Sequence, residues 1–282
     1  MIILVKPAEL LLRGINRLRR ALYRRGILKA KRLPKPVISI GNVTFGGAGK
    51  TPATIAIANF LIHRGYRVCV LTRGYGREGA GGPVTRLDAA EFGDEPVLIK
   101  KHAPKADVIV GSNRYEKGAS TNCDVYLLDD GFQHLQLHRD VDVVIDVPNP
   151  RLRREGPSAM RDADVILRRD LRLRVPDALR GKRLFAFSGL ADNEQFFASL
   201  RAAGLDLAGT RGFADHHRYT PANLDALRVA ARAAGAELLV TTEKDATKIG
   251  DDASHPNGEI MAIPAELAID PRDLERIVKM IT

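Results

Sequence analysis

Residues 36–52 have the sequence Pro36-Val-Ile-Ser-Ile-Gly-Asn-Val-Thr-Phe-Gly-Gly-Ala-Gly-Lys-Thr-Pro52. The apolar, β-branched run at 37–40 predicts a buried parallel strand. Residues 53–62 predict a helix, and the turn between the two is rich in glycine and ends in Gly-Lys-Thr. A strand, a glycine loop and a helix in this order are typical of a loop that binds nucleotide triphosphates. The alternative is a chance glycine turn before a helix.

The residues of this loop have clear chemical roles in such a site. Backbone N–H groups of the glycines turn toward phosphate oxygens, and the helix N-terminus adds a partial positive charge. Lys50 is expected to reach the β- and γ-phosphates, and the Thr51 hydroxyl to ligate Mg²⁺. Pro52 suits the first helical turn, where its missing N–H costs nothing. The usual pattern begins with glycine, and Thr44 stands at that position here.

A second candidate site follows the apolar run at 124–128, which ends in Asp129-Asp130. A carboxylate at a strand end beside a phosphate loop holds Mg²⁺, directly or through water. The alternative is a surface Asp-Asp-Gly turn. Further short apolar runs at 67–71, 107–110 and 141–147 alternate with helical stretches, which predicts a parallel sheet.

Composition limits the class of protein. The chain has 282 residues, 45% hydrophobic and 28% charged, as in a globular protein that stays in the cytoplasm. No apolar run approaches the roughly 18 residues of a membrane span, and the N-terminus lacks a signal-peptide core. Cys69 and Cys123 match a reducing compartment and provide no metal-site spacing. The net charge of +10 favours phosphorylated ligands, anionic membrane surfaces or nucleic acid.

Residues 8–25 predict a basic amphipathic helix. Leu11, Ile15, Leu18 and Leu22 recur at helical spacing and form one apolar stripe. Much of the remaining surface is arginine, at Arg13, Arg17, Arg20 and Arg24. Such a helix suits the plane of an anionic membrane. It would equally suit packing of the stripe on the protein's own core, with solvated arginines, and both interpretations stay open.

The amino-acid composition changes after residue 148, where proline and arginine become frequent. We predict a domain boundary near residue 170. Residues 1–170 would form the phosphate-loop domain with the basic helix, and residues 171–282 a smaller α/β unit. In the second unit we expect strands at 183–188, 237–242 and 259–263, and helices at 194–203, 221–234 and 271–280. The predicted fold class is α/β, a P-loop parallel-sheet domain followed by a smaller Rossmann-like lobe.

Six short motifs along the chain occur in the same order as in a known enzyme family. They are 41–52, Thr72-Arg-Gly-Tyr-Gly76, Gly93-Asp-Glu-Pro96, Asp129-Asp-Gly-Phe-Gln-His134, Asp215-His-His217 and Thr242-Glu-Lys-Asp245. With these motifs the chain resembles the tetraacyldisaccharide 4′-kinases, the lipid A pathway enzymes. The resemblance implies transfer of the ATP γ-phosphate to the 4′-hydroxyl of a lipid A disaccharide 1-phosphate precursor. It also implies two Rossmann-like lobes that close over a cleft at the cytoplasmic face of the bacterial inner membrane, with the basic helix facing the membrane as a peripheral anchor.

The resemblance also implies roles for individual residues. Asp94 matches the carboxylate that activates the acceptor hydroxyl, with His216 as its partner and Lys50 on the phosphates. His134 matches a polar position near the nucleotide and metal. The ATP-binding positions are Thr44, Phe45, Gly46, Gly47, Ala48, Gly49, Lys50 and Thr51, and the Mg²⁺ positions are Thr51, Asp129, Asp130 and Glu155. The segment 150–158 before and around Glu155 is shorter than in the family.

The same residues have plainer interpretations. Asp94 precedes an apolar helix and would serve as its N-cap. Asp215-His216-His217 would be a polar loop, and a zinc pair there lacks a third ligand at suitable spacing. Residues 242–245 end a strand and would cap a short helix, although we expect them to line the cleft.

Two rival functions follow from the same features. A membrane-bound P-loop ATPase switch would hydrolyse ATP without a glycolipid acceptor, and the lack of an Asn-Lys-x-Asp motif argues against a GTPase. A nucleic-acid binder would use the basic surplus, but the arginines cluster on one helix with no stacking aromatic motif. We therefore expect no nucleic-acid partner and no obligate protein partner.

Overall fold

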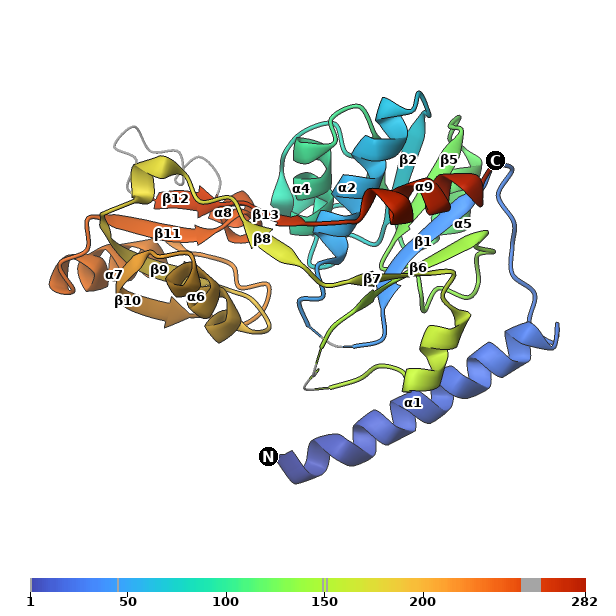
Figure 1. Ribbon diagram of the computed structural model, residues 1–282, viewed down its shortest axis with the longest axis horizontal. Coiled ribbons are helices and arrows are strands. Elements are labelled where there is room, and N and C mark those ends of the chain that lie inside the picture. The colour runs from blue at the N-terminus through green and yellow to red at the C-terminus, as the bar shows by residue number, and fades with distance from the viewer. Residues whose placement is uncertain (1, 45, 149, 151, 250–259) are drawn as a thin grey trace.

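The computed structural model describes residues 2–44, 46–148, 150, 152–249 and 260–282. It contains two parallel sheets, each covered by helices on both faces (Figure 1). We call the larger sheet and its helices the P-loop lobe, and the smaller sheet and its helices the second lobe. Within the described ranges, no helix has the length and apolarity needed to cross a bilayer.

The sheet of the P-loop lobe has seven strands in the order β3-β4-β2-β5-β1-β6-β7. All neighbours are parallel except the short β3, which runs antiparallel to β4. The strands are β1 (Val37–Asn42), β2 (Val68–Thr72), β3 (Gly82–Pro83), β4 (Asp107–Val110), β5 (Val125–Asp129), β6 (Val141–Asp146) and β7 (Val165–Arg168). The strand β5, which ends in Asp129, lies directly beside β1, which leads into the glycine loop. The predicted parallel sheet is confirmed.

Helices cover both faces of this sheet. Apolar side chains of α2 (Lys50–His63), α4 (Asp94–His102) and α9 (Pro271–Lys279) pack into one core with the strands, and α3 (Ala89–Phe92) adds to it. On the opposite face, α5 (Arg114–Ala119) and the segment at 33–37 pack over Tyr126 and Leu128. The helix that Lys50-Thr51-Pro52 was expected to open does begin at Lys50, after Gly49, which adopts a left-handed conformation with φ of 85°.

The second lobe has a four-stranded parallel sheet in the order β10-β9-β11-β12. Its elements are β9 (Arg183–Ser188), α6 (Asn193–Ala202), β10 (Asp206–Gly212), α7 (Pro221–Ala233), β11 (Leu238–Thr242), α8 (Glu243–Ile249) and β12 (Ile260–Ile263), with η2 (Asp177–Leu179) before them. Helix α6 packs on one face and α7 on the other. The edge strand β10 was missed by the sequence analysis, because two glycines and a partly exposed surface give it no apolar run.

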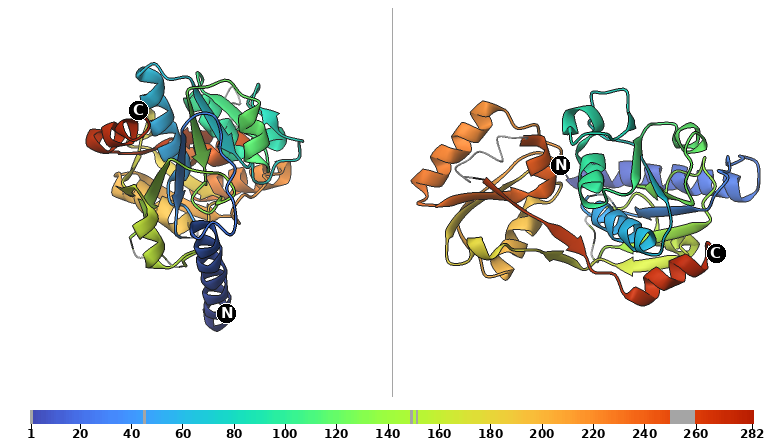
Figure 2. Two further views of the ribbon diagram at one scale, coloured as in Figure 1. Left: turned by 90° about the vertical axis from the view of Figure 1, so that its right-hand side faces the viewer. Right: turned by 90° about the horizontal axis from the view of Figure 1, so that it is seen from above.

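The chain passes between the lobes twice, through β8 (Leu171–Leu173) and β13 (Ala265–Leu267), which pair antiparallel (Figures 1 and 2). After β13 the chain returns to the P-loop lobe, where Ile277 of α9 is buried in the core with Leu267. The division at residue 170 counted the helix at 271–280 with the second unit. Its contacts instead attach it to the first sheet, because its apolar face is buried against α2 and β7.

Helix α1 (Ile2–Arg24) lies along one side of the P-loop lobe, beside η1 (Pro157–Asp162) (Figure 1). Its apolar stripe points outward: Leu11 is 67% exposed, Ile15 47% and Leu18 61%. The polar face points inward, where Asn16 donates a hydrogen bond to the carbonyl oxygen of Arg154 and Arg20 is buried. The interpretation in which the stripe packs on the protein's own core is therefore wrong.

Candidate active site

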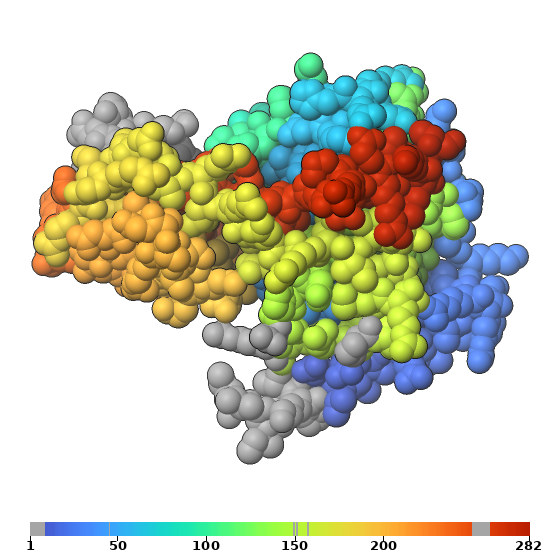
Figure 3. All heavy atoms as spheres, viewed as in Figure 1, coloured from blue at the N-terminus to red at the C-terminus, as the bar shows by residue number. Residues whose placement is uncertain are grey.

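A cavity of about 770 Å³ lies between the two lobes. The strands that join the lobes pass above a recess in the space-filling view (Figure 3). The P-loop lobe contributes the glycine loop, the ends of β2 and β5 and the start of α4, and the second lobe contributes the 190–199 region, His216 and the start of α8. The carboxyl ends of parallel strands from both sheets thus face one cavity, which is where ligands bind in such folds.

The glycine loop forms one wall of the cavity. The lining includes the predicted residues Gly46, Gly47, Ala48, Gly49, Lys50 and Thr51. Gly46 and Gly49 have φ of 90° and 85°, which side chains other than glycine rarely adopt. Together with the N-terminus of the 14-residue α2, this loop presents backbone N–H groups and a partial positive charge to an anion.

Asp129 is buried at the end of β5. Its two carboxylate oxygens accept hydrogen bonds from the hydroxyls of Thr54, 3.0 Å away on α2, and Thr72, 3.1 Å away on β2. Burial raises the pKa of Asp129 to about 6, and the nearby charges of Glu95 and Asp130 add to the effect. The Thr54 bond places the first turns of α2 beside this carboxylate.

Asp130 has a left-handed backbone with φ of 49° and faces two cations. The Nζ of Lys50 lies 3.3 Å from its carboxylate and the Nη1 of Arg154 lies 3.2 Å away. Burial opposes ionisation of Asp130, but the charges of Lys50 and Arg154 outweigh it and hold the pKa of Asp130 below its ordinary value. The lysine expected on the phosphates and the carboxylate expected on the metal are thus adjacent.

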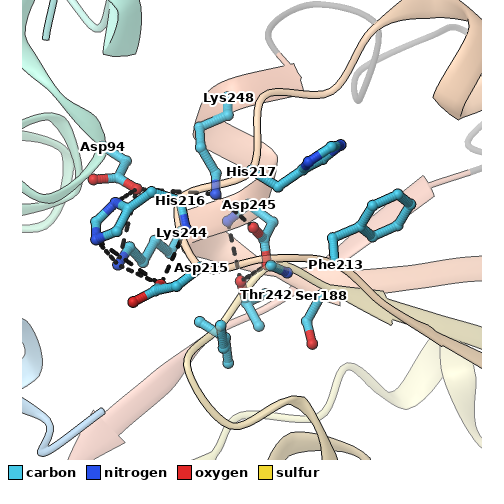
Figure 4. A network of polar contacts seen from close by, with 12 residues as sticks. Asp94, Ser188, Phe213, Asp215, His216, His217, Thr242, Lys244, Asp245 and Lys248 are labelled. Atoms are coloured by element: carbon cyan, nitrogen blue, oxygen red, sulfur yellow. Dashed lines mark hydrogen bonds and ion pairs between the residues drawn. The ribbon is translucent and has the colours of Figure 1, made fainter. Parts of the chain in front are cut away.

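Asp94 and His216 come from different lobes and are hydrogen-bonded. The Nδ1 of His216 lies 3.0 Å from the Oδ2 of Asp94, and only 4% of Asp94 is exposed (Figure 4). Burial opposes ionisation of Asp94, but the bond to His216 and the charges of Lys244 and Lys248 outweigh it and lower its pKa. The N-cap position of α4 is Gly93, so the interpretation of Asp94 as the cap is wrong.

The structure adds two lysines that the sequence analysis gave no role. Both are on α8, one turn apart: the Nζ atoms of Lys244 and Lys248 each lie 3.9 Å from the Oδ2 of Asp94. Lys244 belongs to the Thr-Glu-Lys-Asp stretch, which lines the cavity through Thr242, Glu243 and Lys244, as expected. Spacing of four residues on one helix was the signal that could have joined Lys248 to it.

Arginines also line the cavity, at Arg73, Arg114, Arg154 and Arg169. Arg114 is buried, which lowers its pKa, while the charges of Asp129 and Asp130 act in the opposite direction. A guanidinium stays charged throughout the physiological range. The arginines were visible in the sequence but scattered over almost a hundred residues, so no local pattern joined them.

Some sequence-predicted residues do not line the described cavity, and one lies outside the described residues. Thr44 is buried and its hydroxyl accepts a hydrogen bond from Asn42, and Phe45 lies outside the described residues. His134 is partly buried, which together with the charge of Arg114 lowers its pKa to about 4. Thr44, His134 and Glu155 are absent from the described cavity lining, and so is Asp94, although its neighbour Glu95 and its partner His216 line the cavity.

Glu155 is buried against α1, where both its oxygens have partners. Its Oε2 accepts from the Nε of Arg20 at 2.5 Å, and its Oε1 accepts from the Nη2 of Arg20 at 2.8 Å and from Gln133 at 2.9 Å. A buried carboxylate needs such partners to remain charged. In this structure Glu155 therefore anchors α1 to the loop that follows β5.

Comparisons with known proteins show which family the chain resembles. The family model described as tetraacyldisaccharide-1-P 4′-kinase matches residues 1–170 and 158–282. A tetraacyldisaccharide 4′-kinase of Geobacter metallireducens is 38% identical over 93% of this chain and 93% of that protein. One of Anaeromyxobacter dehalogenans is 38% identical over 92% of this chain and 85% of that protein.

A solved structure is also similar. It is an LpxK from Aquifex aeolicus in complex with ATP, which matches with a TM-score of 0.76 and 28% identity. The match covers 100% of this chain and 99% of that chain.

Proposed function

The chain belongs to the tetraacyldisaccharide 4′-kinase family, and on this premise we propose how its cavity performs the reaction. The reaction is transfer of the ATP γ-phosphate to the 4′-hydroxyl of a lipid A disaccharide 1-phosphate precursor. The observation that supports the proposed mechanism best is the hydrogen bond between Asp94 and His216, which joins the two lobes at the cavity that the phosphate loop lines. The family match also disfavours an ATPase switch without an acceptor.

The phosphate loop and Lys50 bind the triphosphate of ATP in this proposal. Backbone N–H groups of the loop contact the phosphate oxygens, and Lys50 exchanges its contact with Asp130 for the β- and γ-phosphates. Arg73 and Arg114 line the same cavity and add positive charge near the transferred group. Cationic groups fixed before the reaction stabilise the charge that spreads over the γ-phosphoryl oxygens.

The residues at the cavity fit Mg²⁺. The carboxylates of Asp129 and Asp130 and the hydroxyl of Thr51 are hard oxygen ligands that line one wall of the cavity. These three groups would hold the ion together with the ATP phosphates, and the ion would neutralise charge on the β- and γ-phosphates. Glu155, the fourth predicted metal position, is bonded to Arg20 instead, so we leave it out of this set.

Asp94 acts as the proton acceptor. As the 4′-oxygen forms its bond to the γ-phosphorus, the bond from phosphorus to the bridging oxygen breaks and ADP leaves. The hydroxyl proton passes to the Asp94 carboxylate, which His216 orients through its hydrogen bond. Because the two residues belong to different lobes, closure of the lobes assembles this pair.

Mutation of the pair tests the proposal. Asp94→Ala and His216→Ala should each lower kcat at least about a hundredfold with little change in KM for ATP, because general-base catalysis contributes on that scale. The double variant should be little worse than either single variant, since residues that act as a unit show non-additive losses. The assay uses purified protein, ATP, Mg²⁺ and the disaccharide 1-phosphate, and measures 4′-phosphorylated product and acceptor-dependent ADP release.

A matched control distinguishes catalysis from helix capping. Asp88 caps α3 by accepting hydrogen bonds from the backbone N–H groups of Ala90 and Glu91. Asp88→Ala should cost about 1 kcal/mol of stability and leave turnover nearly intact. If the kcat loss of the Asp94 and His216 double variant equals the product of the two single losses, the two residues do not act as a unit.

We also propose that the protein works as a peripheral protein at the cytoplasmic face of the bacterial inner membrane. The outward stripe of α1, with Leu10 beside Leu11, Ile15 and Leu18, supports this proposal, because it leaves contiguous apolar surface on a helix that carries many arginines. Arg20 takes no part in lipid binding here, since it is buried and pairs with Glu155 of the same chain.

A further inference from the structure

The two ring nitrogens of His216 have different partners. Nδ1 lies 3.0 Å from the carboxylate of Asp94, and Nε2 lies 3.3 Å from the Nζ of Lys244 (Figure 4). A lysine ammonium has hydrogens to donate and no lone pair to accept with. A hydrogen bond from Lys244 therefore requires a lone pair on Nε2, which leaves the single ring hydrogen on Nδ1, where it faces an acceptor.

Lys244 is held firmly in this position. Its Nζ is 3.4 Å from Glu95, and it also faces Asp94 and Asp215, each at 3.9 Å. Burial opposes its charge, but these three carboxylates outweigh burial and raise the pKa of Lys244 above its ordinary value. The ammonium therefore stays charged throughout the neutral pH range.

The backbone beneath Lys244 is also fixed. The fully buried Asp245 accepts hydrogen bonds from the N–H of Gly189 at 3.0 Å and the hydroxyl of Thr242 at 2.7 Å, and it pairs with Lys248 at 2.7 Å. These contacts tie the start of α8 to the end of β9. Lys244 thus points toward His216 from a helix start whose backbone is held by these contacts.

All the charged groups around His216 must be weighed together. The ring contacts Asp94 of α4, Lys244 of α8 and Asp215 of its own loop, and the Tyr75 ring centre lies 4.9 Å from it. Two further charged groups belong to the same cluster: Glu95 faces Lys244, and Lys248 faces Asp94. Asp215 would favour a proton on Nε2, but its Oδ1 is 3.9 Å from that atom, beyond hydrogen-bond distance. That same oxygen accepts from the His216 backbone N–H at 3.1 Å. Lys244 is the closer partner of Nε2.

We propose that Lys244 is a positioning residue that fixes His216 as the neutral tautomer with its hydrogen on Nδ1. This inference rests on the proposed role of Asp94 as the proton acceptor. With the ring neutral, Asp94 receives a hydrogen bond but no full positive charge from His216. A doubly protonated ring would form an ion pair with Asp94 and make the carboxylate a weaker base. The cation of Lys244 opposes that second proton by like-charge repulsion.

The pH dependence of the Lys244→Met variant tests the proposal. Without the ammonium, Lys244 no longer opposes a second proton on the ring, and Asp94 loses a cation that lowers its pKa, so the acid limb of the kcat/KM profile should move to higher pH. The loss of turnover should be more than about tenfold near pH 6 and smaller near pH 9, with KM for ATP unchanged. Lys244→Arg keeps a charged donor and should keep the wild-type profile.

Lys101→Met is the matched control. Lys101 also links α4 to α8, through Glu243 at 3.0 Å, but within the part of the chain that the structure describes it forms no hydrogen bond or ion pair with His216. Its loss removes a lysine from the same interface and should leave the acid limb in place. Thermal unfolding of each variant shows whether it is folded at the assay temperature.

Nitrogen NMR of histidine-labelled protein provides a readout that does not depend on activity. The His216 signal, assigned with His216→Gln, should show a protonated Nδ1 and an unprotonated Nε2 at neutral pH in the wild type. In Lys244→Met it should shift toward the doubly protonated ring. A proton on Nε2 in the wild type, or a Lys244→Met profile that overlays the wild-type one, would overturn the inference. Retained activity of the Asp94 and His216 variants would instead overturn the proposed function, and the NMR spectra would still decide the tautomer.

Discussion

Asp129 is a buried carboxylate whose ionisation affects the stability of the fold. Ionised, it is a ligand suited to Mg²⁺, but it is buried beside Glu95 and Asp130, and its pKa is raised to about 6 from an ordinary value of 3.8. The folded protein therefore holds this proton over a pH range in which the unfolded chain has released it. Stability from this residue is complete below about pH 4 and is lost as pH rises through about 6.

Asp129→Asn should therefore stabilise the protein in EDTA without nucleotide at pH 8, by roughly 1 to 3 kcal/mol. The amide cannot ionise, yet it can still bond the hydroxyls of Thr54 and Thr72. Urea unfolding at a series of pH values should show the difference shrinking toward pH 4. Saturating ATP and Mg²⁺ should reverse the order, because they bind the ionised carboxylate. A difference independent of pH would contradict this account.

Helix α1 has its apolar side in solvent and its polar side on the protein, which reverses the usual arrangement of a surface helix. Arg20 stabilises it by bonding Glu155 and the carbonyl oxygen of Phe132, while its guanidinium lies 4.1 Å from the centre of the Phe132 ring. The helix is thus docked through buried polar contacts beside the loop that follows β5. Its exposed leucines can therefore contact the apolar part of a membrane.

Changing Leu11 and Leu18 to serine together should weaken binding to vesicles of anionic phospholipid by at least about tenfold, since each leucine contributes roughly 1.5 to 3 kcal/mol when fully buried. Because both side chains are exposed, the fold and the ATP affinity should be unchanged. The measurement is vesicle co-sedimentation, with turnover on vesicle-presented and detergent-dispersed acceptor compared.

Val229→Ser on α7 is the control, because Val229 is equally exposed but lies on the second lobe. It should bind vesicles as the wild type does. Undiminished vesicle binding of the double leucine variant would rule out the stripe as the membrane contact.

The sequence predicted the elements whose signal is local. The run at 37–52 combines β-branched residues, glycines and Gly-Lys-Thr, so its strand, loop and helix follow from neighbouring residues. The stripe of α1 was visible too, but a periodic pattern shows which residues share a face and not which face meets the protein. That choice depends on Glu155, more than a hundred residues away.

The candidate site could be predicted only in part for the same reason. Asp94 and His216 were paired through the family resemblance, and the structure confirms their contact. Lys248 and Arg114 were missed because their proximity to the site arises from the packing of α8 and the burial of α5. The helical spacing relates Lys248 to Lys244, but nothing local in the sequence encodes the distance of Lys248 or of Arg114 from the site.

At the scale of the whole molecule, polar contacts on both sides of the cavity hold the lobes together. Glu243 of α8 accepts from Lys101 at 3.0 Å and bonds His102 at 2.8 Å, both at the end of α4. On another side Arg218 pairs with Glu78 and donates to the carbonyl oxygen of Gly76. The phosphate loop belongs to one lobe alone, so these contacts govern closure and not nucleotide binding.

Glu243→Ala should shift the lobes toward an open arrangement. Loss of about 1 kcal/mol of closing interaction corresponds to about a fivefold change in a two-state equilibrium. We expect kcat to fall by a similar factor with ATP affinity unchanged, and small-angle X-ray scattering of the ATP-free protein to give a larger radius of gyration. Glu275→Ala removes a pair with Arg64 inside the P-loop lobe and should leave the radius unchanged. An unaltered radius in Glu243→Ala would show that other contacts suffice to hold the lobes.

Because α9 packs on the first sheet, the two lobes can complete their folding at different times during synthesis of the chain. The ribosome produces β1 and α2 before the second lobe, but Leu267 and Ile277, which complete the apolar core beside them, are made after it. The second lobe, whose strands lie between 183 and 263, has its whole sequence available before α9 exists. Synthesis of the nucleotide-binding half therefore begins before that of the second lobe and is completed after it, and a nascent chain arrested before residue 271 exposes the apolar face of α2 and β7 to chaperones and proteases.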